Sequence, residues 1–263
     1  MELHADLDQP VTLDTTALPW MPSPMAGVER RMLDRRGGEV ARATSIVRYA
    51  PGSRFERHVH AGGEEILVLE GTFSDEHGDY PAGTYLRNPA GSAHTPCSES
   101  GCTLLVKLQQ MHPADQQRLV IDSRQGCWQS APVAGLALLP LHHWGSENVA
   151  LRRLAPSTVV PHHSHPGGEE ILVLEGVFQD DHGSYPAGSW LRQPPGSAHQ
   201  PSSEQGQRRF RPGEHWQRGQ VRYRVETCPL IPSCVRLWPT GGLPANPIHR
   251  HPGNTTHFRR IKP

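Results

Sequence analysis

The chain contains the same long segment twice. Residues 58–101 align without gaps on residues 163–206, at an offset of 105, and 31 of the 44 positions are identical. The match continues towards the N-terminus at an offset of 108, after a three-residue insertion or deletion. There Trp20 aligns with Trp128, and Glu39 aligns with Glu147. A repeat of this length is a whole domain, not the 20–50-residue unit of a solenoid. The sequence therefore predicts two similar domains in tandem.

Each copy consists of short strand-like runs separated by turns rich in glycine and proline. In the first copy the runs are ATSIVRYA, EEILVLEGTF, GTYLRNP and CTLLVKLQQ. Short runs at this spacing, with little 3.6-residue periodicity, indicate an all-β sandwich or barrel. We divide the chain into an N-terminal arm (1–19), a first domain (20–120), a second domain (121–206) and a tail (207–263).

The tail departs from the repeat at a single point. After Gly206 the second copy does not resemble the first, and residues 207–263 hold 11 Lys and Arg against 2 Asp and Glu. One interpretation is a basic extension that binds an acidic surface. The other is a sequence that does not fold, such as translation in a shifted frame. Within the tail, residues 220–227 alternate like a strand, and we expect this segment to replace the missing last strand if the tail folds.

Charge and cysteine content exclude several classes of protein. The formal net charge is zero, so the overall charge does not indicate either a nucleic acid or a membrane as a partner. Five cysteines without regular spacing do not describe a disulfide framework. No signal peptide and no run of 18 apolar residues is present. We expect a cytoplasmic protein that binds a small-molecule ligand or substrate, with a homodimer as an open alternative.

The repeated segment carries the donors of a metal site. His58 and His60 are two residues apart in a strand context, so both imidazoles project to one side. The AGG turn returns the chain so that Glu64 lies beside them, and a further turn, strand and turn lead to His94. Three imidazoles and a carboxylate suit a divalent transition metal. The second copy supplies the same set at the same spacing: His163, His165, Glu169 and His199.

The coordination number would decide the chemistry of such a site. A six-coordinate metal would keep two positions for water, substrate or dioxygen, whereas tetrahedral zinc would be closed by four protein ligands. No catalytic residue is assigned, because there is neither a Gly-rich phosphate loop nor a G-x-S-x-G motif. Asp75 and Asp180 are interpreted as turn-forming residues, and Glu39 and Glu147 as structural. Three pairs, if they point inward, would distinguish the two pockets: Tyr85/Trp190, Thr95/Gln200 and Cys97/Ser202.

The ligand segments resemble the cupin superfamily. Its first motif, G-x5-H-x-H-x3-E-x6-G, is matched from Gly52 to Gly71. Its second, G-x5-P-x-G-x2-H-x3-N, is matched from Gly83 to His94, with Ser98 in place of Asn. In the second copy Ser157 replaces the opening Gly. The resemblance implies two tandem cupin barrels (double-stranded β-helix or jelly-roll barrels), that is, a bicupin.

More narrowly, the chain is similar to the cupin module of ChrR-type anti-sigma factors. This resemblance implies a sensory or regulatory protein that holds zinc through the eight residues above, with iron, manganese or nickel as alternatives. The family's sigma-binding zinc domain has no counterpart in residues 1–19, so we do not expect anti-sigma activity to carry over. Whether the protein is an enzyme stays open. Similar cupins are iron dioxygenases that cleave carbon–carbon bonds of diketones or hydroxyacetophenones.

Overall fold

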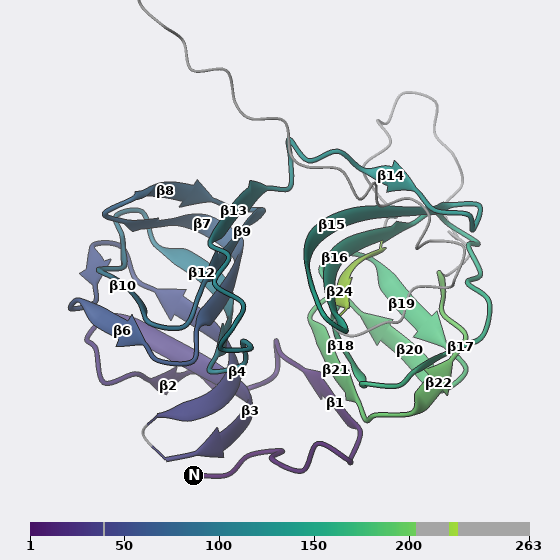
Figure 1. The fold of residues 1–263 in the computed structure, drawn as a ribbon, viewed down its shortest axis with the longest axis horizontal. Helices are drawn as coiled ribbons and strands as arrows, with labels where there is room; N and C mark the ends of the chain where they lie inside the picture. Colours follow the sequence, from purple (N-terminus) through teal and green to yellow (C-terminus); the bar gives the residue numbers. More distant parts are fainter. Residues whose placement is uncertain (39, 204–220, 226–263) are drawn as a thin grey trace, which may run out of the picture.

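The protein folds into two β-barrels that lie side by side (Figure 1). The computed structural model describes residues 1–38, 40–203 and 221–225, and every regular element in these ranges is a strand. No helix long and apolar enough to cross a membrane occurs among them. The all-β fold of two tandem barrels predicted from the repeat is confirmed.

Barrel 1 is built from β2 to β13. Its main sheet has the order β13-β9-β7-β12-β4-β3-β2, and β6 and β10 form a separate antiparallel pair. The strands are β2 (Met21–Pro22), β3 (Val28–Gly37), β4 (Ala41–Tyr49), β5 (Ser53–Arg54), β6 (His58–His60), β7 (Glu64–Asp75), β8 (Gly78–Pro81), β9 (Thr84–Asn88), β10 (Ser92–His94), β11 (Cys97–Ser98), β12 (Cys102–Leu108) and β13 (Leu119–Asp122).

Barrel 2 repeats this plan with its own sheets. One sheet has the order β14-β15-β16-β24, another β1-β21-β18, and β17 pairs with β22. The strands are β1 (Val11–Asp14), β14 (Gln129–Ser130), β15 (Leu136–Trp144), β16 (Glu147–Leu154), β17 (His163–His165), β18 (Glu169–Leu172), β19 (Val177–Asp180), β20 (Gly183–Pro186), β21 (Ser189–Gln193), β22 (Ser197–His199), β23 (Ser202–Ser203) and β24 (Val221–Val225).

The first strand of each repeat completes a sheet in the barrel of the other repeat. Strand β1, in the N-terminal arm, pairs with β21 of barrel 2, and Leu13 lies opposite Trp190. Strand β13, at the start of the second repeat, pairs with β9 of barrel 1, and Ile121 lies opposite Tyr85. The two pairings are equivalent, because β9 and β21 are copies of one strand. The repeats therefore exchange their first strands.

Strand β24 takes the place in barrel 2 that β12 has in barrel 1. Strand β12 pairs with β4 and β7, whereas β24 pairs with β16, the counterpart of β4. It lies within the alternating segment 220–227, and the rest of the tail falls outside the described residues. In barrel 1, β7 is a single strand of 12 residues, whose first part, Glu64 to Gly71, pairs with β12. Its counterpart in barrel 2 divides into β18 and β19, separated by four residues.

The strand registers correct the alignment of the repeats. Val28 lies opposite Tyr49 and Leu136 lies opposite Leu154, so Tyr49 and Leu154 are equivalent, at an offset of 105. The offset of 108 therefore holds only up to β3 and β15, and the length difference lies in the hairpin that follows. The counterpart of Glu147 is Arg42, and the proposed match with residue 39 is wrong.

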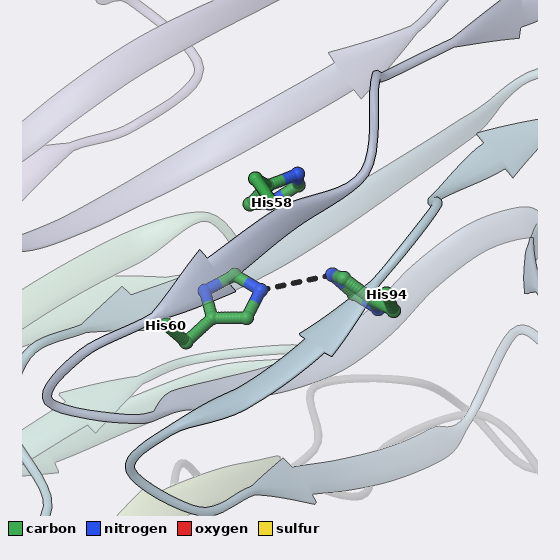
Figure 2. Close-up of side chains that lie close together, drawn as sticks. All are labelled: His58, His60 and His94. Carbon is green, nitrogen blue, oxygen red and sulfur yellow. Dashed lines mark hydrogen bonds between the residues drawn. The ribbon is translucent and has the colours of Figure 1, made fainter.

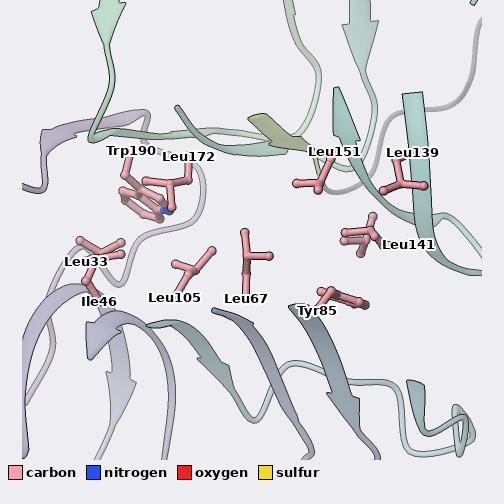
Figure 3. Packing of buried hydrophobic residues seen from close by; sticks show 11 residues of the cluster. Leu33, Ile46, Leu67, Tyr85, Leu105, Leu139, Leu141, Leu151, Leu172 and Trp190 are labelled. Carbon is pink, nitrogen blue, oxygen red and sulfur yellow. The ribbon is translucent and has the colours of Figure 1, made fainter. Parts of the chain in front are cut away.

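An apolar layer joins the barrels (Figure 3). Each barrel also has its own interior cluster, around Phe73 in barrel 1 and Phe178 in barrel 2. Burying one such leucine or isoleucine side chain contributes roughly 1.5–3 kcal/mol, so the shared layer holds the barrels firmly together. The layer comprises Leu33, Ile46, Leu67, Tyr85 and Leu105 from barrel 1, and Leu139, Leu141, Val149, Leu151, Leu172 and Trp190 from barrel 2.

Buried ion pairs border this layer. Arg87, on β9, is fully buried and pairs with Glu147 of barrel 2 at 3.0 Å and with Asp115 at 2.7 Å. Its counterpart Arg192, on β21, reaches across in the opposite direction to Asp34 of barrel 1, at 3.1 Å. Each arginine therefore neutralises a carboxylate of the other barrel.

Candidate metal centres

The pairing of β6 with β10 brings the three histidines of barrel 1 together (Figure 2). His94 lies opposite His58, and His60 is two residues further along the same strand, so all three imidazoles share one face. The Nε2 atoms of His60 and His94 are 3.0 Å apart. His60 and His94 are buried and His58 is half-buried. The structure therefore gathers these predicted ligands as the sequence indicated.

Glu64 joins this cluster from the start of β7. Gly63 turns the chain between β6 and β7 with a φ of +80°, a conformation that favours glycine. One carboxylate oxygen of Glu64, Oε2, lies 3.3 Å from Nε2 of His60 and 3.3 Å from Nε2 of His94. The Asn88 side-chain amide donates a hydrogen bond to the same oxygen at 3.1 Å. All four donors predicted from the first copy therefore lie in one cluster.

Barrel 2 reproduces the cluster with its own strands. His199 lies opposite His163 in the β17–β22 pair, and the Nε2 atoms of His165 and His199 are 3.0 Å apart. Oε2 of Glu169 lies 3.3 Å from Nε2 of His165 and 3.2 Å from Nε2 of His199. The two sites are thus equal in donors and closely equal in geometry.

The hydrogen bonds of the outer ring nitrogens fix which nitrogen faces the cluster. Nδ1 of His58 donates to the carbonyl oxygen of Glu56 at 2.8 Å, and Nδ1 of His163 donates to that of Pro161 at 2.8 Å. A neutral imidazole that donates through Nδ1 keeps the lone pair on Nε2. These rings therefore present acceptor nitrogens to the centre of each site, as metal ligands must.

The distances fit a cation between the donors. Nitrogen and oxygen ligands lie about 2.0–2.2 Å from a zinc ion, so two ligands at right angles are about 3 Å apart. The nitrogen–nitrogen and nitrogen–oxygen distances of 3.0–3.3 Å match this spacing. In barrel 2 both carboxylate oxygens of Glu169 are buried without a hydrogen-bond donor among the described residues. A buried carboxylate of this kind needs a compensating charge, and a bound cation would supply it.

Burial shifts the pKa values of two groups in the second site, His165 and Glu169. It lowers the pKa of His165 to about 3, with the neighbouring histidines adding to the effect, and burial raises the pKa of Glu169. In barrel 1 burial likewise lowers the pKa of His60. Neutral imidazoles at neutral pH are the form that binds a metal.

The sequence suggested that Asp75 and Asp180 shape turns. In the structure each of them also contacts a histidine of a candidate metal site. Oδ1 of Asp75 does accept the backbone N–H of His77, at 2.8 Å. Its Oδ2 accepts Nδ1–H of His94 at 3.2 Å, and Asp180 holds His199 in the same way at 3.0 Å. Each aspartate thus orients a ligand histidine and fixes its tautomer, as carboxylates do around many metal sites. The signal available in the sequence was the recurrence of an aspartate 19 residues before the last histidine.

Replacing Asp75 with asparagine is expected to weaken metal binding at the first centre by about 10–100-fold, because His94 loses its orienting carboxylate. The measurement is a chelator competition in a His199→Ala background, where only the first centre can bind. Asp79→Asn is the matched control: Asp79 lies in the same hairpin and is exposed. Equal affinities for Asp75→Asn and the control would contradict the assigned role.

Two of the residues considered as pocket lining lie elsewhere. Tyr85 and Trp190 are fully buried, but they belong to the apolar layer between the barrels. They therefore do not distinguish one metal site from the other. A third group of candidate ligands, Asp115, His142 and Glu147, lies beside that layer. Arg87 already pairs with both of its carboxylates, so we assign it no metal.

Comparison with known families supports the resemblance found in the sequence. The model of the ChrR cupin-like domain family matches residues 8–112 and again residues 116–215. The chain belongs to this family. Each match includes the first strand of its repeat, β1 or β13, together with one set of three histidines and a glutamate. A search of curated proteins found no match.

Solved structures show the same fold at low sequence identity. A Nostoc punctiforme protein described as a "putative dioxygenase" has a TM-score of 0.66 and 17% identity, covering 83% of this chain and 82% of its own. The Escherichia coli protein YlbA has a TM-score of 0.61 and 13% identity, with coverage of 85% and 92%. A Lactobacillus farciminis oxalate decarboxylase in a formate complex has a TM-score of 0.56 and 13% identity, with coverage of 87% and 90%. The chain is thus a bicupin in fold.

Proposed function

We propose that this bicupin binds one divalent transition metal in each barrel, zinc foremost, and acts as a sensory or regulatory protein. The observation that carries the proposal is the repeated cluster of three histidines and one glutamate. In both copies the histidine Nε2 atoms converge and an aspartate fixes the last histidine. The regulatory role rests on membership in the ChrR cupin-like family.

The metal content of the purified protein tests the first half of this proposal. We expect about two equivalents of transition metal per chain, because each cluster offers a complete donor set. His94→Ala and His199→Ala should each retain about one equivalent. The measurement is elemental analysis after dialysis against metal-free buffer. Wild-type protein that holds no metal, and takes none up on addition of zinc, would overturn the assignment.

A metal-dependent dioxygenase is the second candidate. Four protein donors leave two positions of a six-coordinate iron(II) ion for substrate and dioxygen. The Nostoc punctiforme neighbour described as a "putative dioxygenase" shares this fold and favours this candidate. Asp75 and Asp180 would then hold His94 and His199 in place, and bound iron(II) would supply Lewis-acid and redox chemistry towards a substrate such as a diketone or hydroxyacetophenone.

Oxygen consumption separates the two candidates. Protein loaded anaerobically with iron(II) is mixed with a β-diketone or a hydroxyacetophenone, and oxygen uptake is followed with an electrode. Uptake that requires both iron and substrate, and that is lost in the His94→Ala/His199→Ala double variant, supports the enzyme. Tight zinc binding with no uptake by the iron form supports the regulatory protein.

A further inference from the structure

The carboxylates of the two candidate centres differ in what holds them. Glu64 lies opposite Asn88 in the pairing of β7 with β9, and Glu169 lies opposite Gln193 in the equivalent pairing of β18 with β21. Asn88 and Gln193 are therefore counterparts, at the offset of 105, and each carries a side-chain amide. The amide of Gln193 is one methylene group further from its backbone than that of Asn88.

Asn88 holds Glu64 in the first centre. Leu86, two residues before Asn88 on the same strand, belongs to the interior cluster of barrel 1, so Asn88 lies on the interior face as well. Asn88 is buried, and its Nδ2 donates a hydrogen bond to Oε2 of Glu64 at 3.1 Å. The same oxygen lies 3.3 Å from Nε2 of His60 and 3.3 Å from Nε2 of His94. The amide therefore orients the carboxylate through the oxygen that faces the ligand histidines.

Gln193 does not hold Glu169 in this way. Leu191 belongs to the interior cluster of barrel 2, so Gln193, two residues later, also lies on the interior face. Both carboxylate oxygens of Glu169 are nevertheless buried without a hydrogen-bond donor among the described residues. Gln193 is half-buried and lines a cavity of about 260 Å³ that residues of both barrels share, Arg42 and Glu170 among them. No amide therefore fixes the orientation of the Glu169 carboxylate.

The first and last ligand histidines do not show this difference. In both barrels an aspartate accepts Nδ1–H of the last histidine: Asp75 from His94 at 3.2 Å, and Asp180 from His199 at 3.0 Å. A backbone carbonyl oxygen accepts Nδ1–H of the first histidine at 2.8 Å in each barrel. For these ligands the two centres are alike, and the glutamate distinguishes them.

The freedom of a carboxylate to turn affects which cations a site accepts. A carboxylate has two oxygens and can bind a cation through one of them or through both. Selectivity between cations of different size depends on the size of the site and on the number and flexibility of its ligands. A ligand that is held in place suits one metal–oxygen distance, whereas a ligand that can turn suits several. Glu64 should therefore discriminate between small and large cations more strongly than Glu169.

We propose that Asn88 is a positioning residue that makes the first centre selective for small divalent cations such as zinc, and that the second centre, where Glu169 is not held, also accepts larger ones. The two centres then differ in the cations that they take although their four donors are the same. This inference rests on the proposed metal in each barrel.

Zinc and cadmium test the inference at each centre separately, because both ions are divalent and cadmium is the larger. His199→Ala protein retains only the first centre, and His94→Ala protein only the second. The dissociation constants of both ions are measured by competition with a chelator, and the double variant corrects for cadmium that binds elsewhere. We expect the ratio of the cadmium constant to the zinc constant to be at least about tenfold larger at the first centre. The ratio is decisive because partial misfolding would weaken the binding of both ions alike.

Exchange of the two amide residues assigns the effect to Asn88. Asn88→Leu, which has a similar shape but no amide, should lower the ratio at the first centre to about that of the second. Gln193→Asn in the His94→Ala background should raise the ratio at the second centre, and it carries the test if Asn88→Leu does not fold. Gln193→Leu is the matched control and should leave the ratio at the second centre unchanged.

The measurements separate failure of this inference from failure of the proposed metal sites. If neither ion binds to the single-site proteins or to the wild type, the metal sites themselves are overturned. If the ions bind but the ratio at the first centre is not the larger one, or if neither exchange changes the ratios, this inference alone is overturned.

Discussion

Replacing Arg87 with leucine is expected to lower the free energy of unfolding by about 3–5 kcal/mol, the cost of removing one partner from a buried ion pair. Arg87 is fully buried and neutralises Asp115 and Glu147. Burial raises the pKa of Asp115, but the hydrogen bonds and charge of Arg87 outweigh this effect and hold that pKa below its usual value. Without Arg87, these carboxylates would remain ionised and poorly compensated between the barrels.

Urea denaturation followed by circular dichroism measures this loss. Arg124→Leu is the control, because Arg124 pairs with Asp122 at 2.7 Å on the surface and exposed pairs contribute about 0–1 kcal/mol. Adding Glu147→Leu to Arg87→Leu should recover part of the stability, since it removes a carboxylate that the first change leaves without its partner. A loss below about 1 kcal/mol for Arg87→Leu would show that the interface does not depend on this pair.

Removing the metal is expected to lower the melting temperature by roughly 10 °C or more. A ligand at 100 times its dissociation constant stabilises the native state by about 2.7 kcal/mol, and two such sites contribute about twice as much. For 150–250 residues, 1 kcal/mol corresponds to about 2–4 °C. The effect should be largest for barrel 2, because Glu169 has no hydrogen-bond donor among the described residues.

Thermal unfolding with and without a chelator checks this expectation. The His94→Ala/His199→Ala double variant should melt at the same temperature in both conditions, because neither centre keeps its full set of ligands. The single variants should each lose part of the shift, and His94→Ala, which retains the second centre, should keep the larger part. A wild-type melting temperature that does not change when the chelator is added would contradict a structural contribution from the metal.

The ligand set could be predicted from the sequence because its constraints are local. His58 and His60 share a strand, Glu64 follows one turn later, and the whole pattern occurs twice. The link from Asp75 to His94 was not predicted, because it depends on how the hairpin that contains Asp75 lies against β10. The same spacing of aspartate and histidine would suit many arrangements of those strands.

The pairing of strands that are distant in the chain could not be predicted from local sequence patterns. The segment Val11–Asp14 shows no sign of its partner β21, which lies about 180 residues later in the chain. The position of Arg152 was also missed. At an offset of 108 it would match Thr44, and only the strand registers match it to Val47. A shift of one residue in a strand changes the face that a side chain occupies, so this correction decides which side chains of β16 face the interior of barrel 2.

The exchange of first strands means that the two repeats cannot act as independent modules. Each barrel lacks one strand of its own and is completed by its neighbour through β1–β21 and β13–β9. A single repeat would have a first strand without a partner and a sheet edge without its neighbouring strand. Two copies of the repeat could complete both sheets only by exchanging these strands. The chain is in this sense a covalently fused strand-exchanged dimer, in which each candidate metal centre lies in a barrel that is completed by a strand of the other repeat.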